Sequence, residues 1–148
     1  MHPGLGAAYD LHTALARIKR QRSILYDVQP TSPESLPQLL SAATSRLVVF
    51  GEYSDQTLYG DPKDNHFQRA WHDTLHLALL ADTSAQGEYR VARAQCAELE
   101  RVAGTTLANW LWADLQGQTE HYGAFGCFPT NQAAFVWHYL NTGKVRQF

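Results

Sequence analysis

A histidine-rich segment, HFQRAWHDTLH at residues 66–76, contains the side chains of this chain that are best suited to metal chemistry. Two of its histidines, His72 and His76, are four residues apart. On a helix, side chains four apart lie on one face, with their β-carbons separated by roughly 5–6 Å. Two imidazoles at that separation can bind one metal ion, so the spacing predicts a metal-binding helix.

The same segment has the outline of the zinc-binding motif H-E-x-x-H, with Asp73 at the position of the motif's glutamate. In that position Asp73 is expected to act as a base towards water or as an orienting group. Its side chain is one methylene shorter than that of the glutamate it would replace. This departure from the motif argues against a peptidase.

A third ligand is expected from the next helix. If helices over 66–82 and 86–103 form an antiparallel hairpin, the helical rise puts His76 roughly 9 Å before the turn and Glu88 roughly 6 Å after it. A glutamate side chain can span that offset. Two imidazoles and one carboxylate, with water in the remaining position, match an open catalytic zinc site or the facial triad of non-haem iron. A divalent metal is therefore the predicted cofactor, with zinc favoured over iron or manganese.

His121 is the candidate for a fourth ligand or a proton donor. It lies in a Glu-His-Tyr cluster just before the glycine-rich break GAFGCFP. That position puts it near the end of a predicted helix, where a cleft can open.

Structural interpretations of these residues remain open at this point. The histidine pair could be a hydrogen-bonded surface pair, and Glu88 could stabilise the positive end of its own helix. Asp73 could pair with Arg69, four residues earlier. His121 could simply cap the end of its helix.

The remaining elements are expected to hold the histidine helix in place. The run RLVVFGEY at residues 46–53 predicts a short buried strand, with residues 57–59 as its partner in a ribbon. Asp64 or Asn65 is expected to cap the histidine helix, and Thr31 or Ser32 a short helix before the strand. Further helices are predicted over 5–26, from about 106 to 122, and from about 131 to 142. The prediction is one mainly α domain over 1–148, a bundle of about five to six helices with a small β-ribbon.

Composition narrows the choice of function. The chain has 148 residues, is 45% hydrophobic and carries a net charge of −2. Apart from residues 17–22 it has no Lys/Arg cluster, so nothing favours nucleic acid as a partner. No apolar run approaches the roughly 20 residues that span a bilayer. The N-terminus lacks the pattern of a signal peptide, so a cytoplasmic protein is expected.

Other catalytic motifs are not found. The nucleotide-binding loops and the G-x-S-x-G elbow do not occur in the sequence. Cys96 and Cys127 lie in different segments and are expected to be reduced thiols. Cys127 is close to His121 in sequence, but its neighbours Phe125 and Phe128 would raise the pKa of a thiol, so a Cys-His nucleophile ranks low.

Three segments carry a resemblance, namely LYGDPKDNHFQRAWHDTLHLALLAD, GEYRVARAQ and HYGAFGCFPTNQAAFVWHYL. They resemble small uncharacterised proteins encoded by phages and other mobile elements, in which a YG-P segment precedes an R-A-W-H-D-x-x-H helix and a G-E on the next helix. The resemblance covers roughly half of the chain and implies no established activity. The matching positions are His72, Asp73, His76, Glu88 and His121.

The sequence thus leads to two hypotheses. The first is a small metal-dependent hydrolase with His72, His76 and Glu88 as ligands, and Asp73 and His121 as catalytic candidates. The second is a non-catalytic accessory or interaction protein of a mobile element, in which the same cluster holds a structural metal or is only hydrogen-bonded. A small molecule, a protein or a second copy of the chain could each be the partner.

Overall fold

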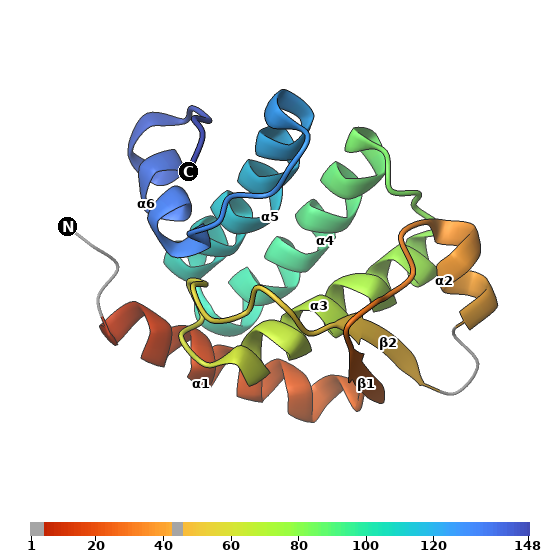
Figure 1. Ribbon diagram of the computed structural model, residues 1–148. Coiled ribbons are helices and arrows are strands. Elements are labelled where there is room, and N and C mark those ends of the chain that lie inside the picture. Colours follow the sequence, from red (N-terminus) through yellow and green to blue (C-terminus); the bar gives the residue numbers. More distant parts are fainter. Residues whose placement is uncertain (1–4, 43–45) are drawn as a thin grey trace.

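The computed structural model describes residues 5–42 and 46–148. Within them the chain forms six helices and a two-stranded sheet, so the predicted mainly α fold is confirmed (Figure 1). Residues 1–4 and 43–45 of the predicted single domain lie outside the described residues. The elements in chain order are α1 (Leu5–Arg22), β1 (Tyr26–Gln29), α2 (Leu36–Ala42), β2 (Leu47–Phe50), α3 (Pro62–Leu79), α4 (Ala85–Ala103), α5 (Thr105–Phe125) and α6 (Gln132–Thr142).

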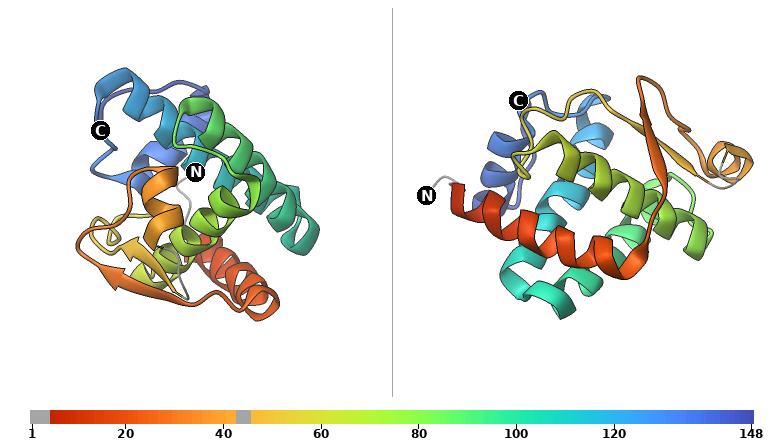
Figure 2. Two further views of the ribbon diagram at one scale, coloured as in Figure 1. Left: turned by 90° about the vertical axis from the view of Figure 1, so that its right-hand side faces the viewer. Right: turned by 90° about the horizontal axis from the view of Figure 1, so that it is seen from below.

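Helix α4 lies at the centre of the bundle. It packs against α3 on one side and α5 on the other, and α6 packs on the far side of α5 (Figure 1). Helix α1 contacts both α3 and α4, and the right-hand view of Figure 2 shows it running alongside α3. In the described part of the chain, no helix has both the length and the apolar character that crossing a membrane requires.

The capping residues fix where the helices begin. Asp61 caps α3, because its side chain accepts a hydrogen bond from the Lys63 N–H at 2.9 Å and Pro62 suits the first helical position. The predicted caps Asp64 and Asn65 are therefore wrong by one turn. Their side chains bind other segments, since Asp64 accepts from His12 and Asn65 donates to Ser54.

The short second helix also begins later than predicted. Ser35, and neither Thr31 nor Ser32, lies at its start, where the Ser35 hydroxyl accepts from the Gln38 N–H at 3.3 Å. Pro37 lies in the first turn of α2, where its missing N–H costs no hydrogen bond.

The sheet pairs β1 and β2 in parallel, with Tyr26 opposite Leu47. The predicted strand at β2 is confirmed, but its predicted partner at residues 57–59 is wrong. Those residues form a buried turn, and the strand pairs instead with residues that follow α1. Ser23 ends α1 with a φ of 47°, and this break releases the next residues into an extended strand.

Trp71 occupies the middle of the core and is fully buried. Around it lie apolar side chains of α1, α4, α5 and α6 that are also fully buried, namely Leu11, Ile18, Leu99, Leu111 and Phe135. The only polar atom of Trp71, the indole nitrogen, donates to Glu98 at 3.2 Å. The same carboxylate accepts two hydrogen bonds from Arg22, at 2.7 and 2.8 Å, and so ties α1, α3 and α4 together.

Replacing Glu98 by glutamine should therefore destabilise the fold. The change removes a charged, bidentate partner from Arg22 and weakens the acceptor for Trp71, and we expect a loss of about 1–3 kcal/mol in the free energy of unfolding. Urea denaturation of the variant measures it. Asp27→Asn, which breaks the exposed pair with Arg46, is the control and should cost less than about 1 kcal/mol. Equal losses in the two variants would contradict the proposed role of Glu98.

Candidate metal centre

A tight loop closes the predicted hairpin of α3 and α4. Leu80 ends α3 in the left-handed conformation, and its N–H donates to the carbonyl group of His76. Ser84 caps α4, because its hydroxyl accepts from the Gly87 N–H at 3.2 Å. Asp82 in turn accepts from the Ser84 N–H at 3.1 Å. The loop thereby fixes the last turn of α3 against the first turn of α4.

Gly87 lies where the two sides of the loop come closest. A β-carbon built at this position would be 1.9 Å from the carbonyl oxygen of Asp82 and 2.5 Å from its Oδ1. No side chain fits there, so the close approach requires glycine. The placement of Glu88, the next residue along the chain, depends on this contact.

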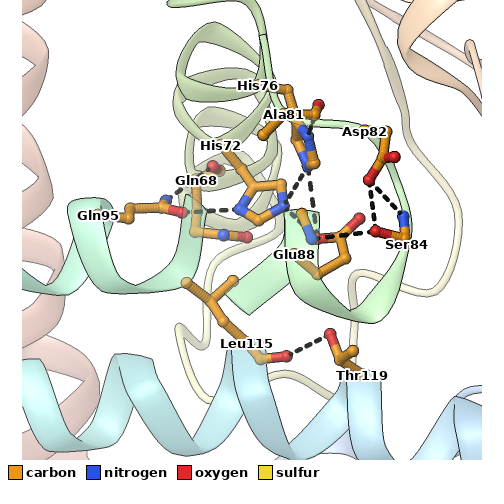
Figure 3. A network of polar contacts seen from close by, with 11 residues as sticks. Gln68, His72, His76, Ala81, Asp82, Ser84, Glu88, Gln95, Leu115 and Thr119 are labelled. Carbon is orange, nitrogen blue, oxygen red and sulfur yellow. Dashed lines mark hydrogen bonds and ion pairs between the residues drawn. The ribbon is translucent and has the colours of Figure 1, made fainter. Parts of the chain in front are cut away.

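Three side chains of the hairpin meet just inside the loop (Figure 3). The Nε2 atoms of His72 and His76 are 3.1 Å apart, and Glu88 Oε2 lies 2.9 Å from the first and 3.4 Å from the second. These side chains form a group whose ligand atoms lie within 4.8 Å of one another. His76 is 4% exposed and Glu88 is 23% exposed, so the group opens towards solvent on the glutamate side. The structure therefore brings the three predicted ligands together.

The other ring nitrogen of each histidine is also bonded. His72 Nδ1 lies 2.8 Å from Gln95 Oε1, and His76 Nδ1 lies 2.8 Å from the carbonyl oxygen of Ala81. Both partners are acceptors, so each Nδ1 carries the hydrogen. A protonated ring can then donate from Nε2 to Glu88, whereas a neutral ring keeps its lone pair on Nε2. Histidine ligands of metals are typically held in this way.

Gln95 was not anticipated from the sequence. It is fully buried, and its Nε2 donates to the carbonyl oxygen of Gln68 at 3.4 Å, which turns its oxygen towards His72. The spacing in the sequence does indicate Gln95, because it follows Glu88 by seven residues and so lies two turns along the same face of α4. The amide thus fixes both the orientation and the tautomer of His72.

Replacing Gln95 by leucine should weaken metal binding while preserving the side-chain volume. The His72 ring would lose the partner that fixes it, and loss of such a partner typically costs about 10–100-fold in metal affinity. Titration of the metal-free protein with Zn²⁺ would measure the change. Gln86→Leu, at an exposed position in the first turn of α4, is the control and should bind as the wild type does. An affinity of Gln95→Leu equal to that of the control would contradict the assignment.

The opposite charges of the histidines and Glu88 shift one another's pKa values. Burial acts to lower the pKa of His72, but the hydrogen bond and charge of Glu88 outweigh it, and the pKa is raised. Burial acts to raise the pKa of Glu88, but contacts with His72 and His76 lower it to about 2. Glu88 is therefore a carboxylate throughout the neutral range and can serve as an anionic ligand.

Asp73 lies beside the group without joining it. It is partly buried, and burial raises its pKa to about 6 against the opposing charges of His72 and His76. The pairing with Arg69 that the sequence left open does not form. The Arg69 guanidinium donates instead to the carbonyl oxygens of Phe50 and Glu52 at the end of β2.

His121, the other catalytic candidate, lies in a different part of the bundle. It is fully buried, its Nδ1 donates to the carbonyl oxygen of Cys127 at 2.7 Å, and its ring packs against Phe125 and Phe135. It does not belong to the group formed by the three predicted ligands. The structure thus places His121 at the junction of α5 and α6, where its hydrogen bond to Cys127 fixes the segment that follows α5.

The fold and the site together define a mainly helical protein with a two-histidine, one-carboxylate cluster in an α-helical hairpin. Comparisons with protein-family models, with curated proteins and with solved structures gave no match. The functional assignment accordingly depends on the chemistry of the cluster itself.

Proposed function

We propose that this chain binds one divalent metal ion through His72, His76 and Glu88, and that it is a small metal-dependent hydrolase. The observation that carries the proposal is the convergence of two Nε2 atoms and one carboxylate oxygen while both Nδ1 atoms are bonded elsewhere. Each neutral ring therefore has its lone pair on Nε2, where a metal ion can take the place of the proton shared with Glu88.

The spacing of the three atoms supports metal binding. Ligand atoms about 2.0–2.1 Å from a metal ion lie roughly 3.4 Å apart in a tetrahedron and roughly 3.0 Å apart at neighbouring corners of an octahedron. The observed separations of 2.9, 3.1 and 3.4 Å fall in this range. The site thus suits an ion of this size with only small movements of the side chains.

The donor types narrow the choice of ion. Two imidazoles and a carboxylate suit zinc, iron or manganese, and zinc is the first choice because it accepts this ligand set in open catalytic sites. Three protein ligands leave room for water, which zinc activates as a nucleophile near neutral pH. Asp73, whose charge acts on both histidines, is the nearby candidate for the base.

Metal content is the first test. Protein purified without a nickel column, stripped with a chelator and titrated with Zn²⁺ and Co²⁺ should bind one equivalent of either ion. Bound Co²⁺ should give visible absorption bands of low coordination number. His12→Ala, which removes an exposed histidine paired with Asp64, is the control and should bind equally well. Absence of bound metal, both as purified and on titration, would overturn the proposal in favour of a purely hydrogen-bonded cluster.

His76→Ala then separates a catalytic metal from a structural one. A variant that loses the metal and remains folded by circular dichroism supports an active site. A variant that unfolds supports the alternative, an accessory or interaction protein with a structural metal. Screening the zinc-loaded protein against ester, amide and phosphoester substrates, with the metal-free protein as the blank, tests the hydrolase directly.

A further inference from the structure

One end of the molecule carries an exposed aromatic surface that the proposed metal centre does not use. Every residue of the segment 122–128, YGAFGCF, is exposed, and none is charged. Tyr122, Phe125 and Phe128 are 51%, 41% and 57% exposed. The rings of Tyr122 and Phe128 lie together, with centroids 5.0 Å apart, and Phe125 follows Tyr122 by about one turn of α5. We name these three rings the aromatic tip.

The aromatic tip is held in place by the end of α5. Gly126 ends the helix with a φ of 71°, and its N–H donates to the carbonyl oxygen of Tyr122 at 2.8 Å. The buried His121 ring lies 4.8 Å from that of Phe125, and its Nδ1 donates to the carbonyl oxygen of Cys127 at 2.7 Å. The rings are therefore exposed in a fixed arrangement. Exposed aromatic side chains gathered in this way mark a binding surface.

The charge around the aromatic tip is positive. Residues 121–148 contain no Asp or Glu, and their Lys and Arg residues are Lys144 and Arg146. Both are exposed, and among residues 5–42 and 46–148 no ion pair includes either of them. The Thr130 N–H donates to the carbonyl oxygen of Phe148 at 3.3 Å, which ties their segment to the chain just after the tip. Figure 1 shows the end of α5 and this C-terminal segment at the same end of the molecule.

We propose that the aromatic tip, with Lys144 and Arg146, is a docking surface for an anionic lipid bilayer. The three rings insert into the interfacial region, where aromatic side chains are favoured. The two cations bind the acidic headgroups, because a negatively charged membrane surface attracts nearby basic residues. The protein then lies on the bilayer without crossing it. This inference is independent of the proposed metal function.

Other partners suit this surface less well. A second copy docked about a twofold axis would bring like charges together, since the nearest acid in sequence, Glu120, accepts from Gln116 one turn back along α5. Two cations pair with few phosphate groups, whereas binding of nucleic acid depends on many. An acidic protein would have to supply a pocket for each ring. A bilayer interface accepts protruding rings of any shape.

Cosedimentation with lipid vesicles tests the proposal, using the full-length protein. It should bind vesicles of phosphatidylserine and phosphatidylcholine in equal amounts, bind less at high salt, and not bind phosphatidylcholine alone. Phe125→Ser combined with Phe128→Ser should weaken binding at least about ten-fold, because apolar area is no longer buried. Lys144→Gln combined with Arg146→Gln should also weaken it at least about ten-fold.

Matched controls remove the same groups elsewhere on the surface. Tyr9→Ser deletes a ring on α1 that is 71% exposed, and Arg101→Gln deletes an exposed cation on α4. Both should bind vesicles as the wild type does. Phe125 also packs against His121, so Phe128→Ser alone is a second test that disturbs the fold less. Circular dichroism establishes that each variant is folded.

Three results would overturn the proposal. The first is a wild type that does not bind the anionic vesicles. The second is binding that the ring and cation variants leave unchanged, since another surface would then be responsible. The third is self-association without lipid that the same substitutions abolish, which would assign the aromatic tip to a second copy. None of these results bears on whether the protein binds zinc.

Discussion

Glu88→Gln should lower the affinity for Zn²⁺ by more than about a hundred-fold while the protein remains folded. The amide has nearly the same shape as the carboxylate but no negative charge, and a neutral amide oxygen is a much poorer ligand for zinc. Loss of a direct ligand should exceed the roughly 10–100-fold effect of losing a supporting hydrogen bond. Isothermal titration of metal-free protein would give the two affinities.

Glu100→Gln is the matched control for this experiment. Glu100 lies on the same helix, is exposed, and accepts a hydrogen bond from Thr105. Its replacement removes the same charge from α4 without touching the cluster, so zinc affinity should stay at the wild-type value. If the two variants bound zinc equally, Glu88 would not be a ligand.

Gly87→Ala is expected to have the largest effect on stability. The added methyl group would lie 1.9 Å from the Asp82 carbonyl oxygen, and backbone on both sides of the contact must shift to relieve it. Overpacking of this kind costs about 1–3 kcal/mol, and a clash with backbone falls at or above the upper end of that range. The shift should also weaken zinc binding, because Glu88 and the Ala81 carbonyl group border the same loop.

A second glycine provides the comparison. Gly123 lies inside α5 with no atom within 4 Å of an added β-carbon, so Gly123→Ala should raise the free energy of unfolding by about 0.5–1 kcal/mol. Guanidinium denaturation of the two variants measures both effects. A Gly87→Ala protein as stable as the wild type would show that the loop has other conformations open to it.

The three proposed ligands could be predicted because their placement depends on local regularities. A spacing of four residues on a helix and a short hairpin turn determine where His72, His76 and Glu88 lie. The placement of Gln95 follows the same rules. From the sequence alone, however, a glutamine that orients a histidine cannot be distinguished from one exposed to solvent. The role of Gln95 becomes clear only from the structure, in which its side-chain oxygen contacts His72 Nδ1.

Contacts between residues far apart in the sequence could not be predicted in this way. The distance of His121 from the cluster depends on how α5 packs along α4, which the spacing of apolar residues does not specify. The pairing of β1 with β2 depends on a left-handed residue, Ser23, whose conformation no local motif marks. The sequence predicts that residue 114 lies on a helix. It does not predict the hydrogen bond between Tyr59 and Asp114, because these residues are 55 apart in the chain.

The hairpin loop also has a consequence for how the centre assembles during folding. The three proposed ligands lie within seventeen consecutive residues, so bringing them together requires closure of one short loop, which costs little chain entropy. Contacts this close in sequence form early in folding. His72, His76 and Glu88 would thus come together in a nascent hairpin before the remaining helices pack against it.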